Sequence, residues 1–377
     1  MLPVFVVADS IVSPLGISIA ENFEQVKNGV SAIQEITNKA LSPNSFFAAM
    51  FTTIPYTPNY TRFETICIES LEKALANTDI KLSNSDTIFI LSTTKGNIEL
   101  IEANEMSVTL SKNVSLSNSA TKIAGNFNAV NRPVVVSNAC VSGVVAVILA
   151  KRLLESGKYK HAVIVGADVL SKFVISGFQA LQAMSMQPCK PFDAKRSGIN
   201  LGECAATIIL STDSTKVNAK QKIKVLGGAA SNDANHISGP SRTGLELSHA
   251  IKNALQDSAV TATDLAFISA HGTATIYNDE MEAKAFNNAL LSQVPLHSLK
   301  ANFGHTLGAA GVLESILSYH SLIKGVVLPS KNYDVLGVSE SVNVNRSIKN
   351  TSKFVALKTA SGFGGCNAAI VYRLEQN

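Results

Sequence analysis

The chain of 377 residues contains no tryptophan, and aromatic residues make up only 6% of it. Its five cysteines are odd in number and show no close pair spacing, which argues against a disulfide framework and favours a reducing compartment. No apolar run is long enough to span a bilayer, because Lys151 and Arg152 interrupt the best candidate. The opening MLPVFVVADSIV lacks a basic leader and a small-residue cleavage site, so we expect it to form a strand rather than a signal peptide. We expect a cytoplasmic protein with no membrane partner.

Charged residues are also sparse, at 16%, and the net charge is +4 without any dense block of lysine or arginine. This pattern argues against a nucleic-acid partner, although a mildly basic surface would suit an acidic protein. Hydrophobic residues make up 46% of the chain, a globular composition that can build a large core.

Strand-like and helix-like segments alternate along the whole chain, which predicts an α/β fold with a largely parallel sheet. Residues 36–62 are irregular and rich in proline, threonine and asparagine, and we expect a cap or surface excursion there. The expected strands are 4–8, 87–92, 133–137, 161–167, 206–210, 222–230, 265–270, 295–301, 353–361 and 368–374.

Two series of these segments look alike. The segment 87–97 resembles 265–279, and the longer segment 134–158 resembles 296–325. Each of the two longer segments has a strand, one reactive side chain and a Gly/Ala-rich helix that ends at a lysine and a glycine. An internal duplication explains the likeness, and its seam falls in the polar stretch 211–221. We therefore expect an N-terminal half, 1–215, and a C-terminal half, 216–377, whose reactive groups converge from equivalent strand ends.

The N-terminal half offers one candidate nucleophile, Cys140, where the valine strand 134–136 gives way to an apolar helix. At a helix N-terminus the unpaired N–H groups and the helix dipole would stabilise a thiolate. The small residues Ser142 and Gly143 would let another backbone come close. A buried structural cysteine is an equally acceptable interpretation of this segment alone.

The C-terminal half offers two histidines in unusual neighbourhoods. His271 ends a strand and opens HGTAT, and the spacing of Asp279 and Glu282 suggests a capping box for the next helix. His305 lies in KANFGHTLGAAG, where glycines clear space around one imidazole. Either histidine alone could be an ordinary core residue, but three such groups at matching strand ends favour a common site. No short ligand spacing supports a metal, so we expect none.

With these motifs in view, the chain resembles an elongating beta-ketoacyl-acyl carrier protein synthase of the thiolase superfamily. The motifs run in family order over nearly the whole length: SPLG (13–16), NACVSG (138–143), PFDAKRSGINLGE (191–203), HGTAT (271–275), KANFGHTLGAAG (300–311) and GFGGCN (362–367). The resemblance implies a thiolase-like fold, with two pseudo-duplicated βα halves in an α/β/α/β/α layering.

The resemblance also implies a reaction, the decarboxylative Claisen condensation of an acyl thioester with malonyl-acyl carrier protein, in fatty acid, polyene or polyketide elongation. Cys140 would hold the acyl group, and two imidazole N–H donors, His271 and His305, would stabilise the enolate formed by decarboxylation. The backbone N–H groups of Cys140 and Phe363 would stabilise the tetrahedral intermediate. The family uses no cofactor of its own, because the substrates are bound as thioesters to the phosphopantetheine of acyl carrier protein.

Other roles follow from the same resemblance. Lys300 would support the histidines and be held by Glu314, although the two could form an ordinary buried ion pair. Thr273 and Thr275 would bind the phosphopantetheine arm, although local turn bonding explains them as well. The resemblance also concerns three further residues. Phe178 would line the acyl pocket, or it could be an ordinary core residue. Ser361 stands where the family has phenylalanine and would widen the pocket, and Cys366 replaces the family's threonine as a packing residue.

The expected partners are acyl carrier protein and a second subunit, identical or related, in a dimer. Two other functions are open: a chain-length-factor-like partner subunit, and a thiolase or initiating synthase that uses coenzyme A esters. The first typically lacks the nucleophile. The second would be expected to show asparagine in place of one histidine, or a second catalytic cysteine.

Overall fold

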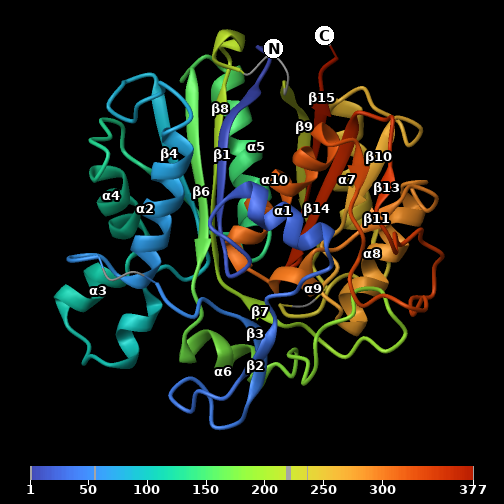
Figure 1. Ribbon diagram of the computed structural model, residues 1–377, viewed down its shortest axis with the longest axis horizontal. Coiled ribbons are helices and arrows are strands. Elements are labelled where there is room, and N and C mark those ends of the chain that lie inside the picture. Colours follow the sequence, from blue (N-terminus) through green and yellow to red (C-terminus); the bar gives the residue numbers. More distant parts are fainter. Residues whose placement is uncertain (1, 55–56, 218–221, 236, 377) are drawn as a thin grey trace.

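A computed structural model describes residues 2–54, 57–217, 222–235 and 237–376. Among these residues, ten strands form one sheet in the order β11-β10-β14-β15-β9-β1-β8-β6-β4-β5 (Figure 1). The strands are β1 (Phe5–Val12), β4 (Thr87–Ser92), β5 (Val134–Val136), β6 (His161–Asp168), β8 (Cys204–Ser211), β9 (Ile223–Asn232), β10 (Leu265–Ser269), β11 (Leu296–His297), β14 (Val355–Gly362) and β15 (Cys366–Leu374).

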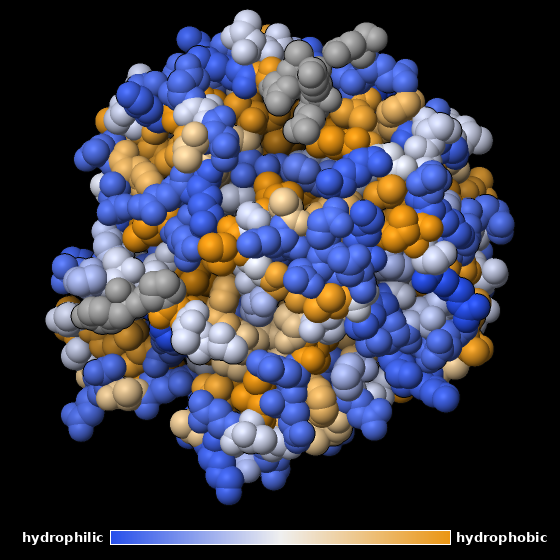
Figure 2. Space-filling view, in the orientation of Figure 1, coloured by the Kyte–Doolittle hydropathy of each residue, from blue (hydrophilic) through white to orange (hydrophobic). Residues whose placement is uncertain are grey.

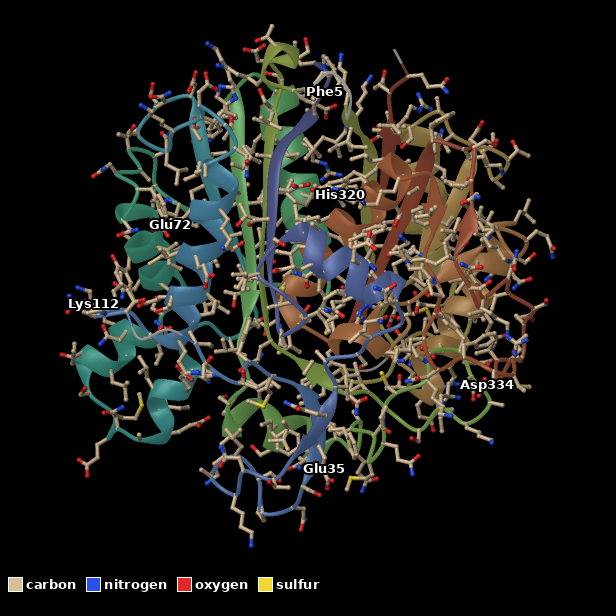
Figure 3. All side chains as sticks on the ribbon, viewed as in Figure 1. Phe5, Glu35, Glu72, Lys112, His320 and Asp334 are labelled. Atoms are coloured by element: carbon tan, nitrogen blue, oxygen red, sulfur yellow. The ribbon has the colours of Figure 1, made fainter. Side chains whose placement is uncertain are left out.

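The two ends of this sheet have the same topology. From the centre outward, the N-terminal strands run β1, β8, β6, β4, β5, and the C-terminal strands run β9, β15, β14, β10, β11. In each series the two inner pairings are antiparallel and the two outer pairings are parallel. The series join at Phe5, which is labelled in Figure 3 and pairs with Lys224 of β9. The repeat seen in the sequence is therefore a repeat in the fold, but the expectation of a largely parallel sheet was wrong, because the closing strand of each half returns antiparallel.

The helices cover the sheet in layers, as Figure 1 shows. Helices α5 and α10 lie between the two halves of the sheet, α2 packs on the outer face of the N-terminal half, and α7 packs on that of the C-terminal half. The helices are α1 (Ile19–Lys27), α2 (Arg62–Leu75), α3 (Val108–Val114), α4 (Leu116–Gly125), α5 (Ser142–Glu155), α6 (Lys172–Ala180), α7 (Leu245–Asp257), α8 (Ile276–Asn288), α9 (Lys300–Phe303) and α10 (Ala310–Ile323), with single 3₁₀ turns at Ile98–Glu102, Ser214–Lys216 and Leu307–Ala309 (η1 to η3). This is the α/β/α/β/α layering expected from the resemblance.

The two central helices approach closely because glycines face each other. A Cβ at Gly143 of α5 would lie 2.7 Å from the backbone nitrogen of Val312, and one at Gly311 of α10 would overlap the backbone of Val144. Real side chains do not make such contacts, so only glycine fits at either position. The predicted close approach beside Cys140 is therefore confirmed, and it brings together the two helices that follow Cys140 and His305.

Two local expectations were wrong. The segment 295–301 forms a strand only at Leu296–His297, and the chain then turns into the short helix α9, which begins at Lys300. The segment 36–62 is only partly irregular: β3 (Phe46–Ala49) pairs with β2 (Gln34–Ile36) and with β7 (Leu201–Gly202) in a small separate sheet. Phe46 is buried there, so apolar burial rather than turn composition decides the structure.

Polar residues cover much of the face in Figure 2, and apolar residues show as separate patches among them. The remaining strands, β12 (Val326–Val327) and β13 (Lys349–Asn350), form a two-stranded ribbon beside the large sheet. Among the described residues, no helix combines the length and the apolar character needed to cross a membrane.

Candidate functional site

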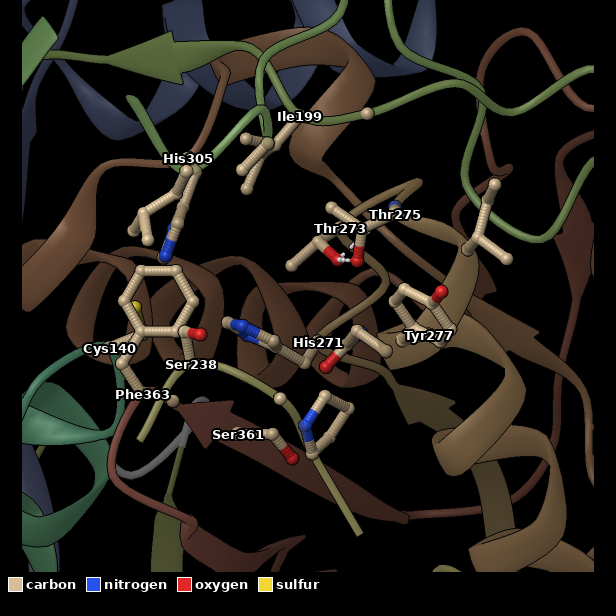
Figure 4. A pocket seen from close by; sticks show the side chains of 18 of the residues that line it. Cys140, Ile199, Ser238, His271, Thr273, Thr275, Tyr277, His305, Ser361 and Phe363 are labelled. Atoms are coloured by element: carbon tan, nitrogen blue, oxygen red, sulfur yellow. Dashed lines mark hydrogen bonds between the residues drawn. The ribbon is translucent and has the colours of Figure 1, made fainter. Parts of the chain in front are cut away.

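The three reactive side chains predicted from the sequence lie together. The Sγ atom of Cys140 and one ring nitrogen each of His271 and His305 all lie within 4.8 Å of one another. The two imidazole rings meet edge to face, with their centroids 5.2 Å apart. Figure 4 shows them converging on one cavity, in which Phe363 lies beside Cys140.

A tight turn places Cys140 two residues before α5. Ala139 has φ +43°, a conformation that residues other than glycine rarely adopt, and it redirects the chain from β5 toward the helix. The Ser142 hydroxyl fixes the turn, because it donates to the Ala139 carbonyl at 2.6 Å and accepts from the Asn138 N–H at 2.7 Å. Such strain is typical of functional sites.

The ionisation of Cys140 differs from our expectation. Burial raises the pKa of the thiol to about 11, although the charge of Lys300 and the backbone N–H of Phe363, which donates to the sulfur, act in the opposite direction. The thiol of the free protein is therefore protonated near neutral pH. The position at the helix start was predicted correctly, but the stabilised thiolate was not, since burial outweighs the favourable charges.

His271 follows β10, and carboxylates hold the loop that carries it. Glu282 of α8 accepts from the N–H of His271 at 2.8 Å and from that of Gly272 at 2.6 Å. Asp279 accepts from the N–H groups of Ala274 and Phe192. Asp279 and Glu282 thus do not form the capping box that their spacing suggested, and instead they clamp the HGTAT loop from the first turns of α8.

His305 is positioned by the PFDAKRSGINLGE segment. Its N–H donates to the Asn200 carbonyl at 2.7 Å, and its carbonyl accepts from the N–H of Gly202 at 2.9 Å. A Cβ at Gly304, where φ is +67°, would overlap the Leu201 carbonyl. The glycine before the histidine is therefore required by this close approach.

Both imidazoles are neutral near pH 7. Burial, followed by the charge of Lys300, lowers the pKa of His271 and that of His305 well below the usual value. A neutral imidazole carries one N–H and one free nitrogen, so it can donate to an oxyanion or accept a proton. Nδ1 of His271 and both ring nitrogens of His305 are buried with no hydrogen-bond partner among the described residues.

A buried charge cluster lies behind the histidines. Lys300 contacts Glu314 with its Nζ 2.5 Å from Oε1, as expected, and Lys358 of β14 contacts the other oxygen, Oε2, also at 2.5 Å. Lys300 and Lys358 are fully buried. The sequence analysis missed Lys358, although one signal was present: it is the only charged residue in the otherwise uncharged stretch 354–361.

The cavity beside the three reactive groups has a volume of about 350 Å³. Its wall contains Cys140, His271, His305 and Phe363, together with the expected substrate-binding residues Phe178, Thr273, Thr275 and Ser361. The rings of Phe178 and Phe363 pack with centroids 5.7 Å apart. The hydroxyls of Thr273 and Thr275 bond to each other at 2.9 Å, which is the local turn bonding that is the alternative to substrate binding (Figure 4).

Two residues that differ from the family motif are held by polar contacts. The hydroxyl of Ser361 donates to Oδ1 of Asn367 at 2.8 Å, and the residue is 4% exposed. The thiol of Cys366 donates to Oδ1 of Asn138 at 2.8 Å, which joins the GFGG loop to the turn before Cys140. Both residues therefore brace the loop that carries Phe363.

Three charged side chains of the PFDAKRSGINLGE segment, Asp193, Arg196 and Glu203, make separate contacts rather than one ion network. Asp193 accepts from the backbone N–H groups of Lys195, Asp334 and Val335, and Arg196 donates to the carbonyls of Asp193 and Gly337. Glu203 instead pairs with Arg62 of α2 at 3.2 Å. These three side chains hold three different parts of the chain.

Comparison with known proteins agrees with this geometry. The family model "Beta-ketoacyl synthase, N-terminal domain" matches residues 1–216, and "Beta-ketoacyl synthase, C-terminal domain" matches 223–334. The chain belongs to the beta-ketoacyl synthase family.

Two curated relatives show how far the sequence likeness to this family extends. The chain is 32% identical to 3-oxoacyl-[acyl-carrier-protein] synthase 2 of Vibrio cholerae, over 67% of this chain and 65% of that protein. It is 31% identical to the tetracenomycin polyketide synthase ketoacyl synthase alpha subunit of Streptomyces glaucescens, over 66% of this chain and 62% of that one. The chain thus spans somewhat less than two thirds of the length of the curated relatives that it matches.

Two solved beta-ketoacyl synthase structures share the fold. One from Burkholderia phymatum superposes with a TM-score of 0.91 at 23% identity and covers 100% of both chains. A ketosynthase in complex with its chain length factor, from Xenorhabdus doucetiae, superposes with a TM-score of 0.86 at 23% identity, over 99% of this chain and 98% of that one. These matches agree with the thiolase-like fold expected from the motifs.

Proposed function

We propose that the chain is an elongating beta-ketoacyl-acyl carrier protein synthase, an acyltransferase that joins an acyl unit to malonyl-acyl carrier protein. One observation carries this proposal: a thiol and two neutral imidazoles meet within 4.8 Å at the wall of a cavity. The relatives named above act on carrier-protein substrates or belong to polyketide synthases, which supports fatty acid, polyene or polyketide elongation.

In the proposed reaction, Cys140 first takes the acyl group. An imidazole accepts the thiol proton, the sulfur attacks the thioester carbonyl, and the carrier-protein thiol leaves with a proton. The N–H groups of Cys140 and Phe363 stabilise the tetrahedral oxyanion. This order suits a thiol with a raised pKa, because deprotonation is coupled to attack rather than completed beforehand.

The second half-reaction forms the new carbon–carbon bond. Malonyl thioester loses carbon dioxide, and the electrons of the broken bond form an enolate whose oxygen accepts hydrogen bonds from His271 and His305. The enolate carbon attacks the acyl-cysteine carbonyl, and the Cys140 sulfur leaves as a thiolate that takes up a proton from water. We assign Lys300, with Glu314, to the electrostatic support of the imidazoles, and Thr273 and Thr275 to the phosphopantetheine arm.

The proposal extends to partners and surroundings. We propose acyl carrier protein as the docking partner and a dimer with an identical or related subunit, since a related fold occurs in the ketosynthase–chain length factor complex. We further propose a cytoplasmic protein that uses no metal and no cofactor beyond the substrate's phosphopantetheine, with its two halves divided at 215/216.

The two other functions fit less well. A chain-length-factor-like subunit does not need a nucleophile beside two histidines. An initiating synthase or thiolase would need asparagine at one histidine or a second catalytic cysteine, and Cys366 donates to Asn138 rather than to a group of the reactive cluster. Intact-mass spectrometry after incubation with acyl- and malonyl-carrier proteins tests the proposal: a thioester adduct and an elongated carrier-protein product support it, and the absence of both contradicts it.

Alkylation should identify the nucleophile. We expect iodoacetamide to modify Cys140 before Cys67, Cys189 and Cys204, at a rate that rises about tenfold per pH unit below the thiol pKa of about 11, because only the thiolate reacts. Cys67, Cys189 and Cys204 are buried and do not line the cavity: burial raises the pKa of Cys189 to about 12 and also raises those of Cys67 and Cys204. Peptide mapping across a pH series measures this order.

Cys366→Ala provides the control for that experiment, since Cys366 is the most exposed of the five cysteines. Labelling of Cys140 should be unchanged in this variant. Modification of Cys67, Cys189 or Cys204 ahead of Cys140 in this variant would remove the basis for the assigned nucleophile.

Ser361→Phe should shift the acyl preference toward short saturated chains, by roughly tenfold in relative kcat/KM, because the ring fills cavity volume next to Gly362. Turnover with short saturated and long unsaturated acyl carrier proteins measures the shift. Ser361→Ala is the matched control, because it removes the bond to Asn367 without adding volume. An unchanged profile in folded Ser361→Phe would mean that neighbouring side chains already set the pocket width.

A further inference from the structure

Lys358 is a second buried cation on the carboxylate that holds Lys300, and no step proposed above uses it. Its side chain is fully buried on β14, and its ammonium lies among three oxygen atoms. Nζ lies 2.5 Å from Oε2 of Glu314 and 3.2 Å from the carbonyl oxygens of both Ser269 and Ala270. Burial lowers the pKa of Lys358, whereas the charge of Glu314 acts in the opposite direction and favours the charged ammonium.

The two carbonyls give Lys358 a connection to His271. Ser269 is the last residue of β10 and pairs with Lys358 in the parallel ladder, and Ala270 is the residue immediately before His271. The ammonium therefore fixes the direction in which the chain leaves β10. On the other side of His271, Glu282 holds the N–H groups of His271 and Gly272, so the strand end is clamped from both directions.

The same ammonium adds charge to the surroundings of both imidazoles. The titratable groups that face Lys358 are Glu314 from α10, Lys300 from α9, Glu282 from α8 and His297 from β11, together with His271 and His305. Burial is the main cause that lowers the pKa of each histidine, and the charge of Lys358 acts in the same direction. Lys300 and Lys358 thus act together, with Glu314 holding two like charges near each other.

We propose that Lys358 is a positioning residue for the decarboxylation half-reaction: it fixes the end of β10 that delivers His271 and, with Lys300, keeps the imidazoles in the neutral form that donates to the enolate. This inference rests on the proposed function. A neutral imidazole is required because a protonated one would also attract the malonyl carboxylate and hold it in place against its loss as carbon dioxide.

Lys358→Met removes the charge and all three donors at similar volume, and Lys358→Gln keeps an amide donor for the strand-end carbonyls. We expect malonyl decarboxylation to fall about 10- to 100-fold in Lys358→Met, as a misplaced catalytic group commonly costs. The acidic limb of the pH–rate profile of Lys358→Met should move to higher pH, because loss of a nearby cation raises an imidazole pKa. Lys358→Gln should recover part of the rate but keep the shifted limb.

Lys151→Met is the matched control. Lys151 is also a buried lysine, 4% exposed, but it pairs with Glu155 near the end of α5, far along the helix from Cys140. It should leave both the rate and the pH profile unchanged. A Lys358→Met variant with a wild-type pH profile and a wild-type rate would overturn the proposal, and so would a lost rate with an unshifted limb in both Lys358 variants, which is what a purely structural role produces.

Histidine titration by NMR makes the test independent of turnover. The ring signals of His271 and His305 should titrate at higher pH in Lys358→Gln than in the wild type, and not in Lys151→Met. If the wild type itself releases no carbon dioxide from malonyl carrier protein, the proposed function fails, whereas the titration still decides whether Lys358 controls the imidazoles. Unmoved ring signals would overturn that control.

Discussion

Cys140→Gln is expected to abolish condensation while malonyl decarboxylation continues. The substitution removes the sulfur that lies within 4.8 Å of a ring nitrogen of each imidazole, so no acyl-enzyme can form at this position. The enolate site is left intact because His271 and His305 are held by other elements, through Glu282 and through residues 200–202. Condensation should fall by at least about 10⁴-fold, the order seen when a nucleophile is removed from a catalytic unit.

Two measurements separate the half-reactions. Mass spectrometry of the carrier-protein product reports condensation, and release of labelled carbon dioxide from malonyl carrier protein reports decarboxylation. Cys67→Ala is the matched control, since Cys67 is a buried cysteine on α2 that does not line the cavity, and it should retain both activities. Condensation by folded Cys140→Gln at the wild-type rate would show that another group carries the acyl chain.

The sequence predicted the site better than it predicted the surroundings of the site. Cys140, His271 and His305 could be found because each follows a strand-like segment and precedes a run of small residues. Equivalent strand ends of a duplicated fold lie close together, and the topology has that form, with the same strand order in both halves. The close packing of α5 on α10 could be expected from glycine alone.

Other features depend on contacts between distant segments, which local patterns do not contain. The pKa of Cys140 is raised by burial, and burial depends on how the GFGG loop and the histidine loops close over the thiol. The strained turn at Ala139 is stabilised by the Ser142 hydroxyl, a contact with no distinctive sequence signal. Asp279 and Glu282 have capping spacing, yet tertiary contacts assign them to the backbone of the histidine loop.

Lys358 is intermediate between the features that the sequence predicts and those that depend on distant contacts. A lysine within an apolar strand indicates a functional or paired charge, so its importance could be suspected from the sequence. Its partner could not, because Glu314 lies on α10 and the two residues meet only when that helix packs against β14. The expected pair of Lys300 and Glu314 also involves only one carboxylate oxygen, Oε1, and leaves the partner of Oε2 unidentified.

His271→Ala and His305→Ala should each lose malonyl decarboxylation by about 10²- to 10³-fold, the usual cost of removing one donor from an oxyanion site. Some acylation of Cys140 should survive in both, because each variant keeps one imidazole that can accept the thiol proton. The two losses should combine to less than their product in the double variant, since a single remaining donor already stabilises the enolate poorly.

Asparagine variants show whether the hydrogen-bond donor is what matters. His271→Asn and His305→Asn keep an N–H donor of shorter reach, so each should retain more decarboxylation than the alanine variant at the same position. His161→Asn is the matched control: His161 is a buried histidine on β6 whose Nδ1 lies 2.9 Å from the Ser211 hydroxyl, away from the cavity. It should leave carbon dioxide release unchanged. Undiminished release from both alanine variants would mean that neither imidazole stabilises the enolate, and the roles assigned to them would have to be withdrawn.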